Sequence, residues 1–209
     1  MIDIAGQLKA IHREVSVRPI EAGDGVGVLL RRGYDASAED VWDAMTDPER
    51  VRRWFLPLTG DLRVGGSFQL EGNAGGEILR CEPPRLLRVT FGGPTSVVEL
   101  RLSAAGDETL LELEHTVPLE MAGSGAGALY VGPGWDGAFM GLDLFLRGEV
   151  VEDPVAMANS LEVQEFSRES VGFWTSVVEA SGTADAAAIA AALEVSMAQF
   201  APDVEATPS

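Results

Sequence analysis

Apolar and polar side chains alternate in two stretches near the middle of the chain. Every second position is apolar in Val98–Leu102, and Leu111–Thr116 has the same period. A period of two sends successive side chains to opposite faces of a strand, so each stretch predicts a half-buried strand. Gly23–Gly25 is a turn signal, expected to join the first two strands in a hairpin. The strands expected are Glu14–Ile20, Val26–Tyr34, Ser67–Glu71, Glu77–Cys81, Leu86–Phe91, Ser96–Ser103 and Thr109–Thr116.

Helix signals interrupt this series of strands. A short helix is expected over residues 3–12. Ser37 is a predicted N-cap because Asp40 follows three residues later and an apolar run comes next. Pro48 suits the first position of a second helix, which is expected to carry Trp54 and Phe55.

A longer helix is expected over Trp135–Arg147, after a glycine-rich stretch at residues 123–134. The preceding Gly132–Gly137 matches the dinucleotide-binding spacing G-x-G-x-x-G, but no parallel βαβ unit surrounds it. We therefore interpret this segment as a turn into the helix. Apolar residues at helical spacing form one continuous face of the helix. This face consists of Trp135, Phe139, Leu142 and Leu146.

The last 60 residues differ from the rest in charge. From Glu149 onward there are eleven acidic residues and one basic residue, Arg168. Apolar positions at helical spacing predict two helices here, over residues 160–180 and 184–200. We therefore divide the chain into a sheet-forming domain, 1–150, and a helical C-terminal extension with a frayed tail, 151–209. The two helices are expected to dock on this domain, or on a second copy in a homodimer, because they would otherwise expose a large apolar patch.

The chain is strongly acidic, with 33 Asp and Glu against 15 Lys and Arg and a formal net charge of −18. This charge repels phosphate backbones and anionic lipids, so nucleic-acid and membrane partners are not expected. The arginine group Arg50, Arg52 and Arg53 is the exception to be tested. Cys81 is the only cysteine, which excludes an internal disulfide and fits a reducing compartment. With no span-length apolar run and no signal-peptide pattern, a soluble cytoplasmic protein is expected.

The segment Tyr34–Glu49 resembles the opening of the START/Bet v1-like (SRPBCC) superfamily. Further motifs follow in the order and spacing of the branch named after the C-terminal domain of the activator of Hsp90 ATPase. These are Trp54-Phe55, Asp61–Gly66, Cys81–Leu86 and Leu111–His115. The resemblance covers roughly residues 20–150. The Gly132–Gly137 segment and the acidic tail resemble an actinobacterial subgroup of that branch.

This resemblance implies a helix-grip fold, in which a curved antiparallel sheet wraps a long C-terminal helix, often with a cavity between them. The order of elements independently predicts an α+β layout with helices on one side of a sheet. The resemblance does not imply one activity, because relatives bind lipids, hormones or polyketides and a few catalyse cyclisation.

Few side chains are suited to acid–base chemistry. His115 is in phase with the apolar positions of its strand, so it is expected on the buried concave side. There it is a general acid or base, a polar anchor or a hydrogen-bonded core histidine. Glu77 and Asp61 are the carboxylates expected nearest the cavity, unless they are exposed or paired with arginines. Cys81 is expected to be a small core residue. One buried histidine makes no metal site, and no cofactor is expected.

The cavity wall is expected to be mostly apolar with one polar point, as in small-molecule sites. We therefore expect a binding protein for a small apolar or amphipathic ligand, rather than an enzyme. Two alternatives stay open. One is an enzyme of the polyketide cyclase or aromatase type that uses His115 with a carboxylate, and the other is a protein–protein module resembling the Hsp90 activator. The ligand-binding residues expected are Trp54, Phe55, Phe68, Leu70, Leu111, Leu113, His115, Trp135, Phe139, Leu142 and Leu146.

Overall fold

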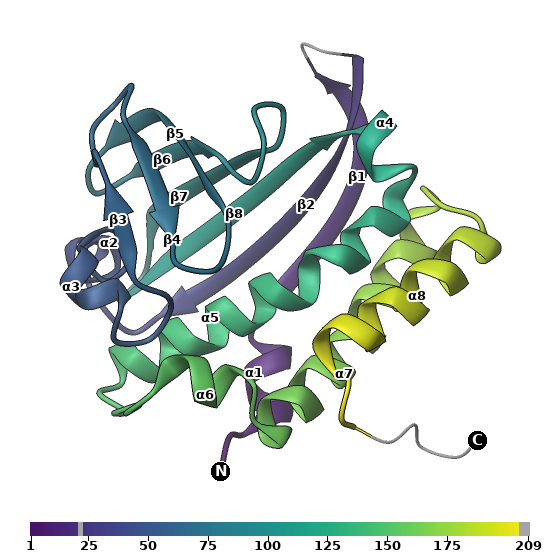
Figure 1. Ribbon diagram of the computed structural model, residues 1–209. Coiled ribbons are helices and arrows are strands. Elements are labelled where there is room, and N and C mark those ends of the chain that lie inside the picture. The colour runs from purple at the N-terminus through teal and green to yellow at the C-terminus, as the bar shows by residue number, and fades with distance from the viewer. Residues whose placement is uncertain (21–22, 205–209) are drawn as a thin grey trace.

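The computed structural model describes residues 1–20 and 23–204. Its strands form one eight-stranded antiparallel sheet in the order β1-β2-β8-β7-β6-β5-β4-β3. Helix α5 lies across this sheet, with α7 and α8 beside it (Figure 1). The fold is therefore α+β, as predicted, and is consistent with a helix grip. The strands are β1 His12–Ile20, β2 Gly23–Tyr34, β3 Leu58–Gly60, β4 Ser67–Leu70, β5 Gly75–Glu82, β6 Leu86–Thr90, β7 Val97–Ala105 and β8 Glu108–Pro118.

The N-terminal hairpin is present, but its turn is placed differently from the prediction. Strands β1 and β2 pair from His12 with Arg31 to Ile20 with Gly23. Residues 23–25 therefore belong to β2 and are not the turn, because their backbone continues the ladder. The connecting residues 21 and 22 lie outside the described residues.

The six predicted helices are present in the predicted order with shifted ends, and the short helices α4, η1 and α6 were not predicted. Helix α3 ends at Val51, so Trp54 and Phe55 follow it instead of lying on it. The reason is local: the amides of Arg53 and Trp54 bond carbonyls three residues back, which tightens and ends the helix. The helices are α1 Ile4–Lys9, α2 Ala38–Thr46, α3 Pro48–Val51, α4 Leu119–Ala122, the 3₁₀ helix η1 Gly125–Tyr130, α5 Gly132–Leu146, α6 Pro154–Ala158, α7 Leu161–Ser181 and α8 Ala186–Phe200.

The segment interpreted as a turn before α5 is in fact the first turn of that helix. Pro133 is tolerated there because the first amides of a helix have no intrahelical partner. A Cβ atom at Gly132 would overlap the indole ring of Trp174 on α7. Glycine at this position therefore lets the two helices approach closely, so helix packing explains the first glycine of the G-x-G-x-x-G match.

The C-terminal helices dock on the sheet-forming part of the same chain. Phe166, Trp174 and Val178 on α7 are fully buried, and Ile189 on α8 belongs to the same apolar core as the sheet residues. Phe173, on the same helix, is 42% exposed and lies under the Arg13 guanidinium. The main core thus draws on both parts of the chain, and the division at residue 150 stays a prediction.

Candidate functional site

A pocket of about 210 Å³ lies between α5 and strands β4 to β8, and we call it the inner pocket. Tyr34 holds α5 against the sheet, because its hydroxyl donates a hydrogen bond of 3.1 Å to the Phe139 carbonyl. Burial raises the pKa of Tyr34, so the hydroxyl keeps its proton. Nine of the eleven predicted ligand residues line this pocket: Trp54, Phe55, Phe68, Leu70, Leu111, Leu113, Trp135, Phe139 and Leu142.

Strand periodicity explains most of the sheet side of the inner pocket. On β6, Leu87 and Val89 point inward with Phe91 just beyond the strand end, although the sequence analysis did not assign them to the site. The same alternation used for β8 would have found them. On β5 the alternation breaks, because a bulge between Ile78 and Arg80 inserts one residue. The bulge brings both Ile78 and Cys81 into the pocket wall.

Four predicted residues lie outside the inner pocket. Leu146 is half-buried against the core but does not line it. Glu77 is exposed, because it neighbours the inward-facing Ile78 and so points to the other face of β5. Asp61 is also exposed and pairs with Arg63 at 2.9 Å. These two carboxylates are therefore not the cavity acids that the sequence suggested.

His115, the fourth, is buried with both ring nitrogens bonded. The indole Nε1 of Trp135 donates to His115 Nδ1 over 3.1 Å, so the ring proton lies on Nε2. Nε2 then donates to the Ser96 hydroxyl over 2.8 Å. Burial lowers the pKa of His115 to about 4. The side chain is thus neutral at physiological pH and orients Trp135, which makes it a hydrogen-bonded core histidine rather than a free acid or base.

A second pocket, of about 440 Å³, lies on the opposite side of α5, and we call it the outer pocket. Its wall combines glycines of α5, the segment after α3, and residues from α6, α7 and the end of α8. His115 of β8, which does not line the inner pocket, lines this one. The two pockets share an aromatic wall, because the same five residues line both: Trp54, Phe55, Phe91, Trp135 and Ala138. The rings pack on one another. Trp54 stacks on Phe55 with 5.3 Å between ring centroids, and Phe91 is tilted against Trp135 with 5.1 Å between ring centroids.

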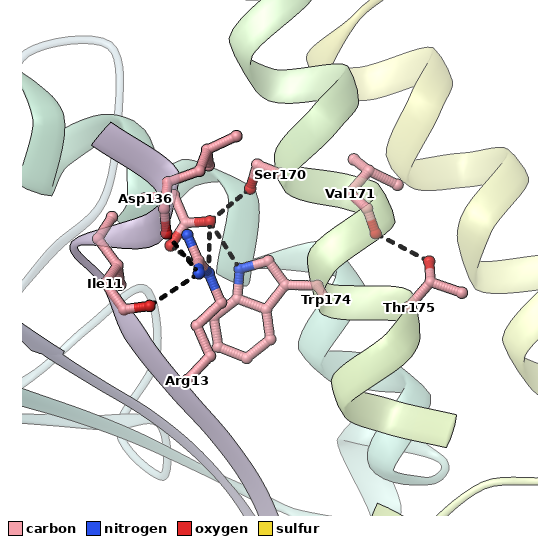
Figure 2. Close-up of polar contacts among 8 residues, drawn as sticks. Ile11, Arg13, Asp136, Ser170, Val171, Trp174 and Thr175 are labelled. Carbon is pink, nitrogen blue, oxygen red and sulfur yellow. Dashed lines mark hydrogen bonds and ion pairs between the residues drawn. The ribbon is translucent and has the colours of Figure 1, made fainter. Parts of the chain in front are cut away.

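A buried polar cluster fixes the remaining side of α5 (Figure 2). Asp136 of α5 accepts hydrogen bonds from Arg13 Nε of β1 and, on α7, from the Ser170 hydroxyl at 2.5 Å and the Trp174 indole at 3.1 Å. Burial raises the pKa of Asp136 to about 6, although Arg13 and these donors oppose the shift. The cluster lies away from both pockets, so we assign it a structural role.

Sequence reasoning missed this cluster, although a signal was present. Asp136 and Asp143 stand seven residues apart in an otherwise apolar helix, which places them on one face. Asp143 pairs with Arg32 at 2.9 Å and accepts a bond from Gln7 at 2.7 Å. Two acids on one stripe of an apolar helix therefore marked the side that meets β1, β2 and α1.

The comparisons with known proteins agree with this geometry. A sequence profile described as Activator of Hsp90 ATPase homolog 1-like protein matches residues 35–147. The chain belongs to that family. The crystal structure of CalU16 from Micromonospora echinospora shares 44% sequence identity with it, covers 81% of this chain and 98% of its own, and has a TM-score of 0.68. The family resemblance stated from the motifs is thus confirmed.

Two further similar structures are more distant in sequence. DynU16, a protein in the dynemicin biosynthetic locus, is 25% identical over 58% of this chain and 48% of its own, with a TM-score of 0.50. A conserved protein of unknown function from Enterococcus faecalis, 15% identical over 78% of this chain and 91% of its own, shares the fold with a TM-score of 0.55. No curated protein matches the chain.

The structure describes residues 1–20 and 23–204, and these ranges show neither a membrane-spanning helix nor a metal site. None of the helices in these ranges combines the length and the apolar character that crossing a bilayer demands. Nor do these ranges hold three or more His, Cys, Asp or Glu side chains placed to bind a metal ion. Of the arginine group, Arg50 pairs with Asp40 at 2.8 Å and Arg52 with Glu49 at 2.6 Å.

Proposed function

We propose that the protein binds a small apolar or amphipathic molecule in the inner pocket. The observation that carries this proposal is the lining, which places nine predicted apolar and aromatic side chains around one space of about 210 Å³. An apolar ligand gains roughly 25 cal/mol for each Å² that it buries, so a bicyclic aromatic molecule reaches about micromolar affinity.

The genetic locus of a similar protein supports a biosynthetic small molecule as the ligand. DynU16 belongs to the dynemicin biosynthetic locus. The alternative hypothesis of an enzyme, a cyclase or aromatase that uses His115 with a carboxylate, is less well supported. His115 already has partners on both nitrogens, and Glu77 and Asp61 are exposed. The other alternative, a protein–protein module resembling the Hsp90 activator, rests on the family description alone.

The test uses 2-naphthol as a probe and calorimetric titration as the measurement. The parent chain should bind the probe saturably, with quenching of Trp54 or Trp135 fluorescence. Leu142, 1% exposed, lines the inner pocket, so Leu142→Trp should fill the space and abolish binding while the melting temperature changes by only a few degrees.

Leu161→Trp is the matched control, because Leu161 is 61% exposed on α7 and lines neither pocket. This variant should bind the probe as the parent does. If the parent binds no probe and Leu142→Trp unfolds the chain, the space is a packed core and the proposed function is wrong.

A further inference from the structure

The outer pocket differs in chemistry from the inner one, although the two adjoin. Its polar side chains are uncharged: the amides and hydroxyls of Asn73, Tyr130, Asn159, Ser167 and Gln199, and the neutral imidazole of His115. Among the residues that the structure describes, no Asp, Glu, Lys or Arg lines it, even though 23% of the chain is charged. Amides, hydroxyls and aromatic faces together recognise uncharged groups that carry hydroxyl or ether oxygens.

Helix α5 has glycines where it faces this pocket. Gly134, Gly137 and Gly141 lie on one side of the helix, opposite Phe139 and Leu142, which face the inner pocket. A Cβ atom at Gly137 would meet no atom within 4 Å, so this residue borders open space. Glycine inside a helix costs roughly 0.5–1 kcal/mol relative to alanine, and packing at Gly137 does not demand it.

The shared aromatic wall lets one molecule reach both pockets. Trp54, Phe55, Phe91 and Trp135 line both spaces, and each of these four side chains is only partly buried. The two spaces are therefore neighbours that share aromatic side chains. A ligand of two parts contacts aromatic carbon in both of them.

Resting on the proposed function, we infer that the ligand is bipartite: an apolar ring system fills the inner pocket, and an uncharged, hydroxyl-bearing arm lies in the outer pocket. The neutral lining excludes a charged arm, since no ionic partner faces it. The net charge of −18 further repels an anionic arm. The C-terminal helices α6, α7 and α8 thereby contribute directly to the specificity of the site.

The test compares three probes that share one ring system: 2-naphthol, 2-naphthyl β-glucoside and 2-naphthyl phosphate. In the parent chain the glucoside should bind about tenfold more tightly than 2-naphthol, and the phosphate more weakly than either. Gly137→Leu fills the outer pocket, so it should remove the advantage of the glucoside and leave the affinity for 2-naphthol within about twofold.

Gly172→Leu is the matched control, because Gly172 lies on the exposed side of α7 and also has no atom within 4 Å of its would-be Cβ. Both substitutions raise helix propensity, so both variants should melt at or above the parent temperature, and Gly172→Leu should bind all three probes as the parent does. Equal binding of glucoside and 2-naphthol by the parent, or an unchanged glucoside affinity in Gly137→Leu, overturns the bipartite site while the inner pocket stands. If none of the probes binds, the proposed function and this inference both fail.

Discussion

His115 illustrates how burial decides the role of a single side chain. Its strand position is consistent with either a cavity acid or a core residue. The two hydrogen bonds, to Ser96 and from Trp135, satisfy a neutral ring and leave no place for a second proton. The same burial that lowers its pKa to about 4 therefore makes the ring a pH-dependent component of stability.

We predict that His115 makes the fold sensitive to acid. The folded pKa of about 4 lies below the ordinary histidine pKa of 6.5. The contribution of His115 to stability is therefore fully present above pH 6.5 and is lost as the pH falls through 4. The loss amounts to about 3 kcal/mol at 1.36 kcal/mol per pKa unit. His115→Gln should show a smaller drop in unfolding free energy between pH 7 and 4, measured by urea titration.

The other histidine provides the control for this experiment. His12 is exposed on β1, with Glu14 at 4.0 Å. His12→Gln should keep the acid sensitivity of the parent. An identical pH dependence in His115→Gln and the parent would show that the buried ring contributes nothing to it.

At the scale of elements, α5 is held from three directions. The sheet, α7 with β1, and the residues that line the outer pocket each contact a different side of α5. The Arg13–Asp136 pair is the polar link between β1, α5 and α7. The Arg13 side chain is only 4% exposed and that of Asp136 is fully buried. Removing either partner of such a pair leaves the other without compensation.

We predict that Arg13→Met destabilises the chain more as the pH rises. In the parent, Asp136 has a pKa raised to about 6, so its contribution is fully present below its unfolded value of 3.8 and is lost as the pH rises through 6. Without Arg13 the pKa of Asp136 rises further. The free energy of unfolding that the variant loses relative to the parent therefore grows to roughly 3 kcal/mol at pH 8. Unfolding free energies at pH 5 and pH 8 measure this difference.

Arg63→Met is the comparison, because Arg63 and Asp61 are both more than half exposed. An exposed pair contributes less than about 1 kcal/mol, so this variant should stay close to the parent at both pH values. A pH-independent loss in Arg13→Met would mean that only packing, and not the buried carboxylate, responds to the substitution.

Local patterns predicted the elements well and the irregularities poorly. The alternation of β7 and β8 and the cap at Ser37 depend on neighbours in sequence, so they were predictable. The bulge that brings Cys81 inward depends on pairing with β6, and the pairing of Asp136 with Arg13 joins residues 123 positions apart. Neither pairing has a local signature: the spacing of the acids on α5 marks a polar side of the helix, but it does not identify Arg13 as the partner, and nothing local predicts the bulge.

At the scale of the whole molecule, the C-terminal helices complete the core. Trp174 and Val178 are fully buried against the sheet-forming part, and Leu129 receives a hydrogen bond from Ser196 of α8 at 2.7 Å. The family profile ends at residue 147, so the helices beyond it are additional to the segment that defines the family.

We predict that a chain ending at Arg147 loses both stability and solubility. Truncation exposes the apolar side of α5 that packs on Trp174 and leaves Asp136 without two of its donors. Thermal melting and size-exclusion chromatography should show a lower melting temperature and association into larger species. An unchanged melting temperature in a monomeric truncated chain would contradict this prediction.

The bulge on β5 has a practical consequence for spectroscopy. Because it brings Cys81 into the wall of the inner pocket, the only thiol of the chain is already at the proposed binding site. A trifluoromethyl tag attached to that sulfur gives one ¹⁹F resonance without any engineered cysteine, and ligand entry would shift it directly. Burial raises the pKa of the Cys81 thiol, so the tag should be attached at alkaline pH, where the reactive thiolate is populated.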